Sequence, residues 1–535
     1  MDKKKDTGSR KKSMLIATVL MMLGLLLSKG SGFVRDIIVG IKFDEVYRDS
    51  YTLAFTIPDL FYNLLVGGAI FSSVAPYMSG SLAVNEEKRG VRTVSIFVSV
   101  ISVVMLVVCT VGVIFSEQIY SVYNLFLAEG DKINPETLSL AANASKFLFP
   151  QIFFIMLAAL SSGILNAYKR FSSTAFAPTV YNICVLLAIM IFAGNTQSEL
   201  MHTTAGVLVS AFIYFMFLYI LGFDILKKFR FKFMPRDKEF LFLLRRALPI
   251  MFSASIVQLN VVILNMFTGR FGNIIFLFRN ANTIWQIPYG VFAVGIGTVM
   301  TPHLAGLYES RKYEECRDLL TSSIKNILFL TIPSAGMIFI MSQNVVAAIY
   351  QWGSRYTDEN VATAAVLLRY LVLPIITQSI VHVMNHAFYA IGKTKVPLLA
   401  GVVGLVTNPL VCWLMIRLDF GLKSLSIAYS VTSIVQMVIL IILYTRNKEI
   451  KPRNIGIFIL KSAICLLFMG VVLVLIETYL PSGFTKLTHV LHLGLRCIVC
   501  VCVYFGMAII LKMEEARFWL DRFLVKLKLK KKTQG

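Results

Sequence analysis

Long apolar runs separated by short polar segments make up almost the whole chain. A helix needs about 20 predominantly apolar residues to cross the hydrocarbon core of a bilayer. Fourteen runs of that kind begin near residues 13, 51, 91, 138, 174, 200, 247, 274, 319, 360, 397, 422, 455 and 487. This pattern predicts an all-α polytopic membrane protein with about 14 transmembrane helices.

Composition and charge fit that class. Hydrophobic residues make up 57% of the 535 residues and charged residues only 15%, which excludes an ordinary soluble protein. The net charge of +23 does not indicate nucleic acid, because most Lys and Arg residues fall in alternate loops and in both tails. By the positive-inside rule, both termini of this multi-pass protein are expected in the cytoplasm. A second expected role of the basic residues is contact with anionic lipid headgroups. No small-residue cleavage site follows the first run, so no cleavable signal peptide is expected.

A faint repeat divides the chain. Val74–Gly80 resembles Met300–Gly306 at an offset of 226 residues, and each copy ends a Gly-rich run with a second proline, Pro58 or Pro288. Paired interrupted helices of this kind are typical of transporters with a site between two halves. The predicted parts are a basic cytoplasmic tail (1–12), an N-lobe of six spans (13–229), a basic linker (230–246), a C-lobe of six spans (247–445), two further spans (446–512) and an amphipathic basic tail (513–535).

Charged and polar residues interrupt several spans. Ionised groups at bilayer depth cost about 2.5–3.5 kcal/mol each on insertion scales and usually mark a pathway or a partner. The candidate substrate-binding residues are Lys29, Arg35, Asp36, Asp49, Asp59, Asn63, Arg279, Thr283 and Arg369. Cationic side chains predominate in the cavity that this set predicts, and guanidinium binds phosphate bidentately, so the pattern favours an anionic, phosphate-bearing substrate over a cationic drug.

The local geometry of these candidates leaves alternatives open. Arg35 and Asp36 point about 100° apart on a helix, so each is expected to need a partner elsewhere, such as Asp49 or Asp59. A structural ion pair is the alternative for Arg35, and Lys29 could extend its flexible side chain to the membrane boundary. Arg279 and Thr283 are one turn apart and share a face. Arg369 could serve only as the partner of an acidic neighbour.

Neither a metal nor a cofactor is expected. His382 and His386 have the spacing of a metal pair, but no Asp or Glu lies in the second half of that span, which favours polar lining or interhelical hydrogen bonds. Cys497 and Cys500 lie in a membrane run without a second ligand pair. No loop is long enough for an aqueous catalytic domain, which argues against an integral-membrane enzyme such as a glycosyltransferase.

Several segments resemble the MurJ/MviN lipid II flippases, which belong to the multidrug/oligosaccharidyl-lipid/polysaccharide exporter superfamily. The matching segments are Ser28–Asp36, Asp49, Ala54–Asp59, Gly67–Pro76, Ile287–Pro302, Tyr350–Gly353 and Phe388–Pro397. The resemblance implies a bacterial plasma-membrane protein with two six-helix lobes around a cationic cavity. It also implies a groove along the two C-terminal helices for the polyprenyl tail. By motif position, Arg35, Asp36 and Asp49 match family residues needed for transport, and Lys29 replaces an arginine.

The chain also departs from the family pattern. Tyr62, Asn63 and Gly67 stand where the family often has two arginines and a glutamate, and the family's arginine in span 8 aligns with Thr283. Arg279, one turn earlier, is our candidate substitute for that arginine. In some members of that family, carboxylates on the seventh and eleventh spans bind sodium. The interiors of these spans have none here, so sodium coupling is not expected, and the membrane potential is the alternative energy source.

The resulting prediction is a flippase, not an enzyme, that moves lipid II between leaflets by alternating access for cell wall synthesis. Its expected partners are lipid II and membrane lipids, with no nucleic acid, and it is expected to act as a monomer. The alternatives are a flippase for another polyprenyl-linked oligosaccharide and a multidrug exporter of the same superfamily.

Overall fold

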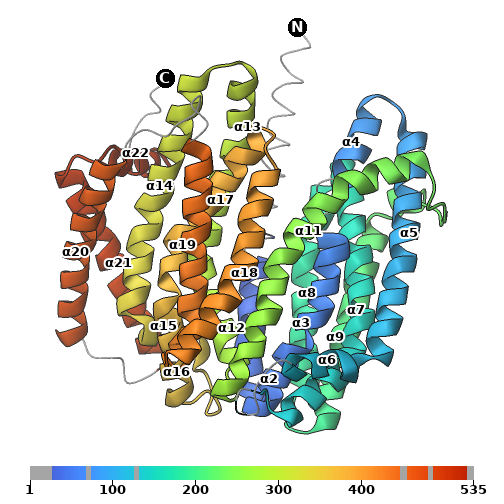
Figure 1. Ribbon diagram of the computed structural model, residues 1–535, viewed down its shortest axis with the longest axis horizontal. Helices are drawn as coiled ribbons and strands as arrows, with labels where there is room; N and C mark the ends of the chain where they lie inside the picture. The colour runs from blue at the N-terminus through green and yellow to red at the C-terminus, as the bar shows by residue number, and fades with distance from the viewer. Residues whose placement is uncertain are drawn as a thin grey trace. The chain divides into compact units, whose positions relative to one another are not determined.

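The described part of the chain is helical throughout (Figure 1). The computed structural model describes residues 24, 27–67, 74–125, 130, 132–445, 455–479 and 486–526. They form two compact units: unit 1 comprises Met1–Phe276 with Gly353–Arg355, and unit 2 comprises Leu277–Trp352 with Tyr356–Gly535. The predicted all-α class is confirmed.

Unit 1 is built around one long helix. Residues 27–42 are helical, and the elements that follow are α2 (Glu45–Ala54), α3 (Thr56–Tyr62), η1 (Asn63–Gly67), α4 (Ala75–Ala83), α5 (Glu87–Ile114), α6 (Ser116–Leu125), α7 (Pro135–Ala167), α8 (Phe171–Phe192), α9 (Gln197–Leu221), α10 (Phe223–Leu226), α11 (Lys238–Met266) and η4 (Phe267–Phe271). The 33-residue α7 packs against α2, α5 and α9. Two-thirds of its most apolar window is buried, so it forms the core of the unit.

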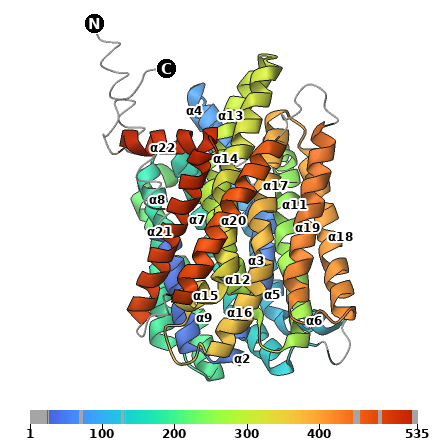
Figure 2. The same cartoon turned by 90° about the vertical axis from the view of Figure 1, so that its left-hand side faces the viewer.

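Unit 2 contains the remaining helices. These are α12 (Ile275–Pro288, from its third residue), η5 (Tyr289–Val294), α13 (Gly295–Glu309), α14 (Tyr313–Ile340), α15 (Ser342–Tyr350), α16 (Asp358–Tyr370), α17 (Val372–Ala390), α18 (Lys395–Arg417), α19 (Lys423–Thr445), α20 (Gly456–Tyr479), α21 (Lys486–Ile510) and α22 (Glu514–Lys526). Here α17 packs against α13, α14 and α19, while α20 and α21 lie side by side (Figure 2). The helix α22 lies within the predicted C-terminal tail (513–535), whose last residues lie outside the described part.

Ten described helices are long and apolar enough to cross a membrane, or eleven if the bent pair α16–α17 counts as one span. These eleven correspond to the expected spans 3–6 and 8–14. The helices 27–42, α2–α3 and α11 lie where the first, second and seventh spans are expected. The total of fourteen therefore stays a prediction that is consistent with the fold.

The repeat is visible in the backbone of both units. The π-helices η1 and η5 begin at Asn63 and Tyr289, 226 residues apart, and each follows a proline of the repeat. The same offset separates Asn85 and Arg311, which end α4 and α13 with positive φ angles of 58° and 57°. Because π-helical segments occur frequently at functional sites, the two interruptions mark corresponding regions of interest.

The division into units differs from the predicted lobe limits at α11, which was expected to begin the C-lobe. Both ends of this helix bond to other parts of unit 1. Near its start, Glu239 accepts hydrogen bonds from three side chains described below, and near its end the Asn265 amide donates to the buried Thr56 hydroxyl at 3.2 Å. These contacts place α11 with unit 1.

Candidate functional site

The charged residues of the first helix form an ion pair with each other. The Arg35 guanidinium donates Nε and Nη2 to Oδ1 of Asp36 at 3.1 and 3.0 Å. The Asp36 side chain is 7% exposed and that of Arg35 is 21% exposed. The expectation that Arg35 needs a partner elsewhere is wrong, because its long side chain folds back along the helix and overcomes the angular separation of adjacent positions.

Asp49 is fully buried and caps a helix far away in the sequence. Its Oδ2 accepts from the backbone N–H of Ile275 and its Oδ1 from that of Phe276, both at 2.9 Å. The first N–H groups of a helix have no intrahelical acceptor and carry partial positive charge, so a carboxylate there is favourable. Both oxygens are therefore engaged at the start of α12, and the expectation that Asp49 pairs with Arg35 is wrong.

Sequence reasoning missed Arg48, which it assigned to a loop. The Arg48 side chain is fully buried in α2; its guanidinium carbon lies 5.1 Å from the centre of the Phe276 ring and one nitrogen lies 3.9 Å from Glu45. Cation–π contact of this kind gains strength in a desolvated site. The sequence signal is its place beside Asp49 directly before an apolar run.

The other candidates of unit 1 are less deeply placed. Asp59 and Asn63 are half-buried, and the Asn63 amide donates to the Asp59 carbonyl at 2.8 Å where α3 passes into η1. Lys29 is exposed, and it forms no ion pair within the described residues.

In unit 2 the structure brings Arg279 and Thr283 together. The Thr283 hydroxyl donates to the Arg279 carbonyl at 2.9 Å, and both side chains are half-buried on one face of α12. Arg369 lies apart from them, at the end of α16. It is exposed, donates to the Ser342 hydroxyl at 3.2 Å and lies 6.0 Å from the Phe339 ring centre. The sequence offered, as an alternative, that Arg369 is the partner of an acidic neighbour. No such ion pair of Arg369 is present among the described residues.

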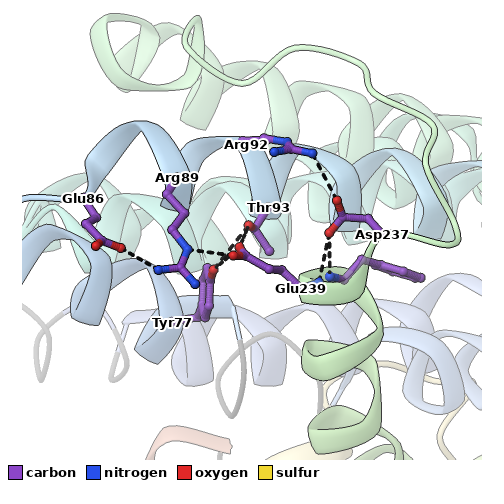
Figure 3. Close-up of polar contacts among 8 residues, drawn as sticks. Tyr77, Glu86, Arg89, Arg92, Thr93, Asp237 and Glu239 are labelled. Carbon is purple, nitrogen blue, oxygen red and sulfur yellow. Dashed lines mark hydrogen bonds and ion pairs between the residues drawn. The ribbon is translucent and has the colours of Figure 1, made fainter.

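A second polar group that the sequence did not predict holds the start of α11 to the α4–α5 hairpin (Figure 3). Glu239 accepts from the Thr93 hydroxyl at 2.5 Å, from the Tyr77 hydroxyl at 2.7 Å and from Nε of Arg89 at 2.7 Å. Arg92 bonds Asp237 at 3.2 Å, and Asp237 caps α11 through the Glu239 amide. We call this group the α11 clasp.

The clasp fixes the charge of Glu239. Partial burial would raise the pKa of this carboxyl, but hydrogen bonds from Thr93, Tyr77 and Arg89 outweigh burial and hold the pKa below its usual range. The linker was predicted to be a positive-inside anchor, and its acidic residues were not assigned a role. They could have been noticed as the only carboxylates, Asp237 and Glu239, in a basic segment.

Comparison with known proteins identifies the family. The family model described as "Lipid II flippase MurJ" matches residues 39–494. The chain belongs to the MurJ family. Its relatives include a probable lipid II flippase MurJ of Rickettsia prowazekii (25% identical, covering 90% of this chain and 94% of the relative) and one of Bdellovibrio bacteriovorus (24% identical, covering 94% and 96%).

Solved structures show the same fold. A lipid II flippase MurJ in an inward closed conformation superposes with a TM-score of 0.73 at 22% identity, covering 92% of this chain and all of that one. A multidrug resistance transporter of the MATE family, in an inward-facing conformation, has a TM-score of 0.67 at 16% identity, covering 81% and 98%. The predicted family is confirmed by the family model, and both solved structures share the fold of this chain.

Proposed function

We propose that this protein moves lipid II from the inner to the outer leaflet of the bacterial plasma membrane by alternating access. Family membership carries the proposal, because the MurJ family model spans most of the chain. The arginines at half-buried positions in both units support it, since guanidinium groups suit the diphosphate of a lipid-linked precursor.

Each unit contributes a different part to this function. In unit 1, Arg35 is held by Asp36, which orients its guanidinium and leaves part of it accessible. In unit 2, Arg279 and Thr283 offer a cation and a hydroxyl on one helix face. Both interrupted helices contain a π-helix, and such irregular segments can absorb the backbone changes of a transport cycle.

We extend the proposal to the oligomeric state, the membrane orientation and the remaining polar residues of the protein. The protein acts as a transporter and not as an enzyme, functions as a monomer, and has both termini in the cytoplasm, as the distribution of Lys and Arg indicates. The polyprenyl chain stays in lipid beside α20 and α21. Lys29, Asp49, Asp59, Asn63 and Arg369 line or support the path, with Asp49 acting through the start of α12.

A rescue experiment tests the proposal in cells. Bacteria depleted of their own lipid II flippase should grow when they express this chain and should fail to grow with Arg35→Ala at equal abundance. The matched control is Arg236→Ala, which removes an exposed arginine of the linker and should rescue fully. Full rescue by Arg35→Ala would overturn the role of Arg35.

The multidrug exporter remains the second candidate, because the MATE structure shares the fold. Growth of sensitive cells in cationic drugs separates the two functions. We expect no protection from this chain, whereas drug resistance without rescue would favour the exporter.

A further inference from the structure

Two histidines of unit 2 form a hydrogen-bonded group with neighbouring hydroxyls, and the proposed transport mechanism does not yet assign them a role. His382 and His386 lie one turn apart on α17, with ring centres 4.4 Å apart. Nδ1 of His382 lies 3.2 Å from the Tyr289 hydroxyl, and Nδ1 of His386 lies 2.7 Å from the Thr301 hydroxyl. The predicted interhelical hydrogen bonds of these histidines are confirmed.

The hydrogen bonds define where the protons of the neutral rings lie. The Thr301 hydroxyl lies 2.8 Å from the Gly297 carbonyl and 2.7 Å from Nδ1 of His386. When it donates its only proton to the carbonyl, it accepts from His386, and that tautomer has its proton on Nδ1 and a lone pair on Nε2. Nε2 of His382 is buried and has no hydrogen-bond partner among the described residues.

Gly297 makes room for the pair. A Cβ at this position would lie 2.9 Å from Cδ2 of His382, 3.0 Å from its Nε2 and 3.6 Å from Cδ2 of His386. Contacts near 3.0 Å are too short for a real side chain, so α13 can approach the His382 ring this closely only because residue 297 is glycine. Side chains of α13 and η5 thus contact the two half-buried histidines of α17.

The helices packed against α17 bring no counter-charge to the rings. The Tyr289 ring of η5 contacts His382, and the Tyr389 ring of α17 contacts His386. Tyr429 of α19 is one ring further away, because Trp285 lies in contact with both Tyr289 and Tyr429. The charged groups and histidines of the neighbouring helices are His303 and Glu309 on α13, Glu314, Glu315, Arg317, Asp318 and Lys325 on α14, Asp358, Glu359 and Arg369 on α16, Lys395 and Arg417 on α18, and Lys423 on α19. Their other titratable side chains are Tyr308 on α13, Tyr313 and Cys316 on α14, Tyr370 on α16, Cys412 on α18, and Tyr429 and Tyr444 on α19. Neither ring forms an ion pair within the described residues. Two imidazolium charges at this spacing would repel each other strongly, so the pair suits one proton and not two.

We propose that His382 and His386 form a proton-binding site that couples transport to proton movement. The proton comes from water: an O–H bond of hydronium breaks and one N–H bond forms on an imidazole of the pair. A protonated His382 donates from both nitrogens, so the Tyr289 hydroxyl must then accept from Nδ1 of His382. Tyr289 begins η5, the interruption between α12, which carries Arg279, and α13. Proton binding therefore acts on the irregular segment beside the proposed substrate residues.

Transport in reconstituted vesicles tests the coupling, which rests on the proposed function. The full chain is placed in liposomes with lipid II, and the exposure rate is compared with and without an imposed pH gradient. We expect the gradient to accelerate the wild type about tenfold. The ratio should fall to about one in His382→Gln/His386→Gln and should decrease in Gly297→Ala. The control His303→Gln, an exposed histidine of α13, should keep the wild-type ratio. An unchanged ratio in the double variant, or no acceleration of the wild type, would overturn the proposal.

Proton counting gives a readout that does not depend on flipping. The folded full chain in detergent is titrated between about pH 8 and pH 5, the range in which histidine changes charge. The wild type should take up about one proton more than the double variant. Equal uptake by the wild type and the double variant would overturn the site while leaving lipid II transport intact. One extra proton in a chain that never moves lipid II would overturn the proposed function and leave the site.

Discussion

The α4–α5 hairpin of unit 1 and the α13–α14 hairpin of unit 2 have the same backbone conformation at the turn but different side-chain contacts. Both turn through a residue with positive φ at the same repeat position, Asn85 or Arg311. Both hairpins have local ion pairs, Arg89–Glu86 in unit 1 and Lys312–Glu315 in unit 2. In unit 1, Arg89 also bonds Glu239, 150 residues away. The repeat therefore conserves the geometry of the chain and not its long-range contacts.

The regions around the two π-helices differ in the same way. Before η1, unit 1 contains the buried Asp49, whose repeat counterpart is Ile275, the residue whose amide it binds. Around η5, unit 2 contains Arg279 and the histidine pair. The corresponding regions of the two units therefore carry different side chains: in unit 1 a buried carboxylate that caps α12, and in unit 2 Arg279 and a pair of histidines.

The largest effect is expected at Asp49. Asp49→Ala would leave the buried N–H groups of Ile275 and Phe276 without an acceptor and should lower the free energy of unfolding by about 3 kcal/mol. Thermal unfolding in detergent measures this loss of stability. The melting temperature of Asp49→Asn, which keeps one acceptor oxygen, should lie between those of the wild type and Asp49→Ala. Equal melting temperatures for the wild type and Asp49→Ala would show that the carboxylate does not hold α12.

The counterpart test in unit 2 concerns transport and not stability. Arg279→Ala should slow lipid II translocation about 30-fold, the effect of losing one charge-assisted contact of about 2 kcal/mol. Arg279→Ala/Thr283→Arg moves the guanidinium one turn along the same face and should recover part of the rate. If the single variant transports at the wild-type rate, Arg279 does not replace the family arginine.

The α11 clasp predicts a pH dependence confined to unit 1. The hydrogen bonds lower the pKa of folded Glu239 below its unfolded value of about 4.3. The ionised carboxylate therefore contributes stability above about pH 4.3, and this contribution is lost as the pH falls through the lower folded pKa. Glu239→Gln should reduce the melting temperature at pH 7, and the difference from the wild type should shrink below pH 4. Glu309→Gln, an exposed carboxyl of α13, should show little difference at either pH.

The smallest expected effect on stability concerns the two turns with positive φ, at Asn85 and Arg311. A left-handed conformation costs most side chains about 1–2 kcal/mol, but Asn tolerates it better. Arg311→Gly should therefore stabilise the protein by up to about 1 kcal/mol, and Asn85→Gly by less. Melting temperatures of the two variants check this order, and a larger gain for Asn85→Gly would contradict it.

Much of the fold could be predicted from the sequence because apolar run length fixes where membrane helices form. The paired prolines also located the interruptions, since proline disfavours a continuous α-helix. The π-helical form of η1 and η5 could not be read from the sequence, because it depends on packing within each unit.

The site was harder to predict at the level of contacts. Adjacent positions suggested that Arg35 and Asp36 could not pair, but side-chain length decided otherwise. The capping role of Asp49 and the clasp at Glu239 join residues more than 140 positions apart, and no local pattern encodes such contacts. The adjacency of Arg279 and Thr283 was correct because helical spacing alone determines it.

Translocation by the purified full chain shows whether this protein moves lipid II and whether Arg35 is needed. Lipid II placed in the inner leaflet of proteoliposomes is followed by its accessibility to an external reagent. We expect rapid exposure with the wild type and Arg236→Ala, and exposure close to that of protein-free vesicles with Arg35→Ala. Wild-type exposure no faster than protein-free vesicles, or equal rates for the wild type and Arg35→Ala, would contradict it.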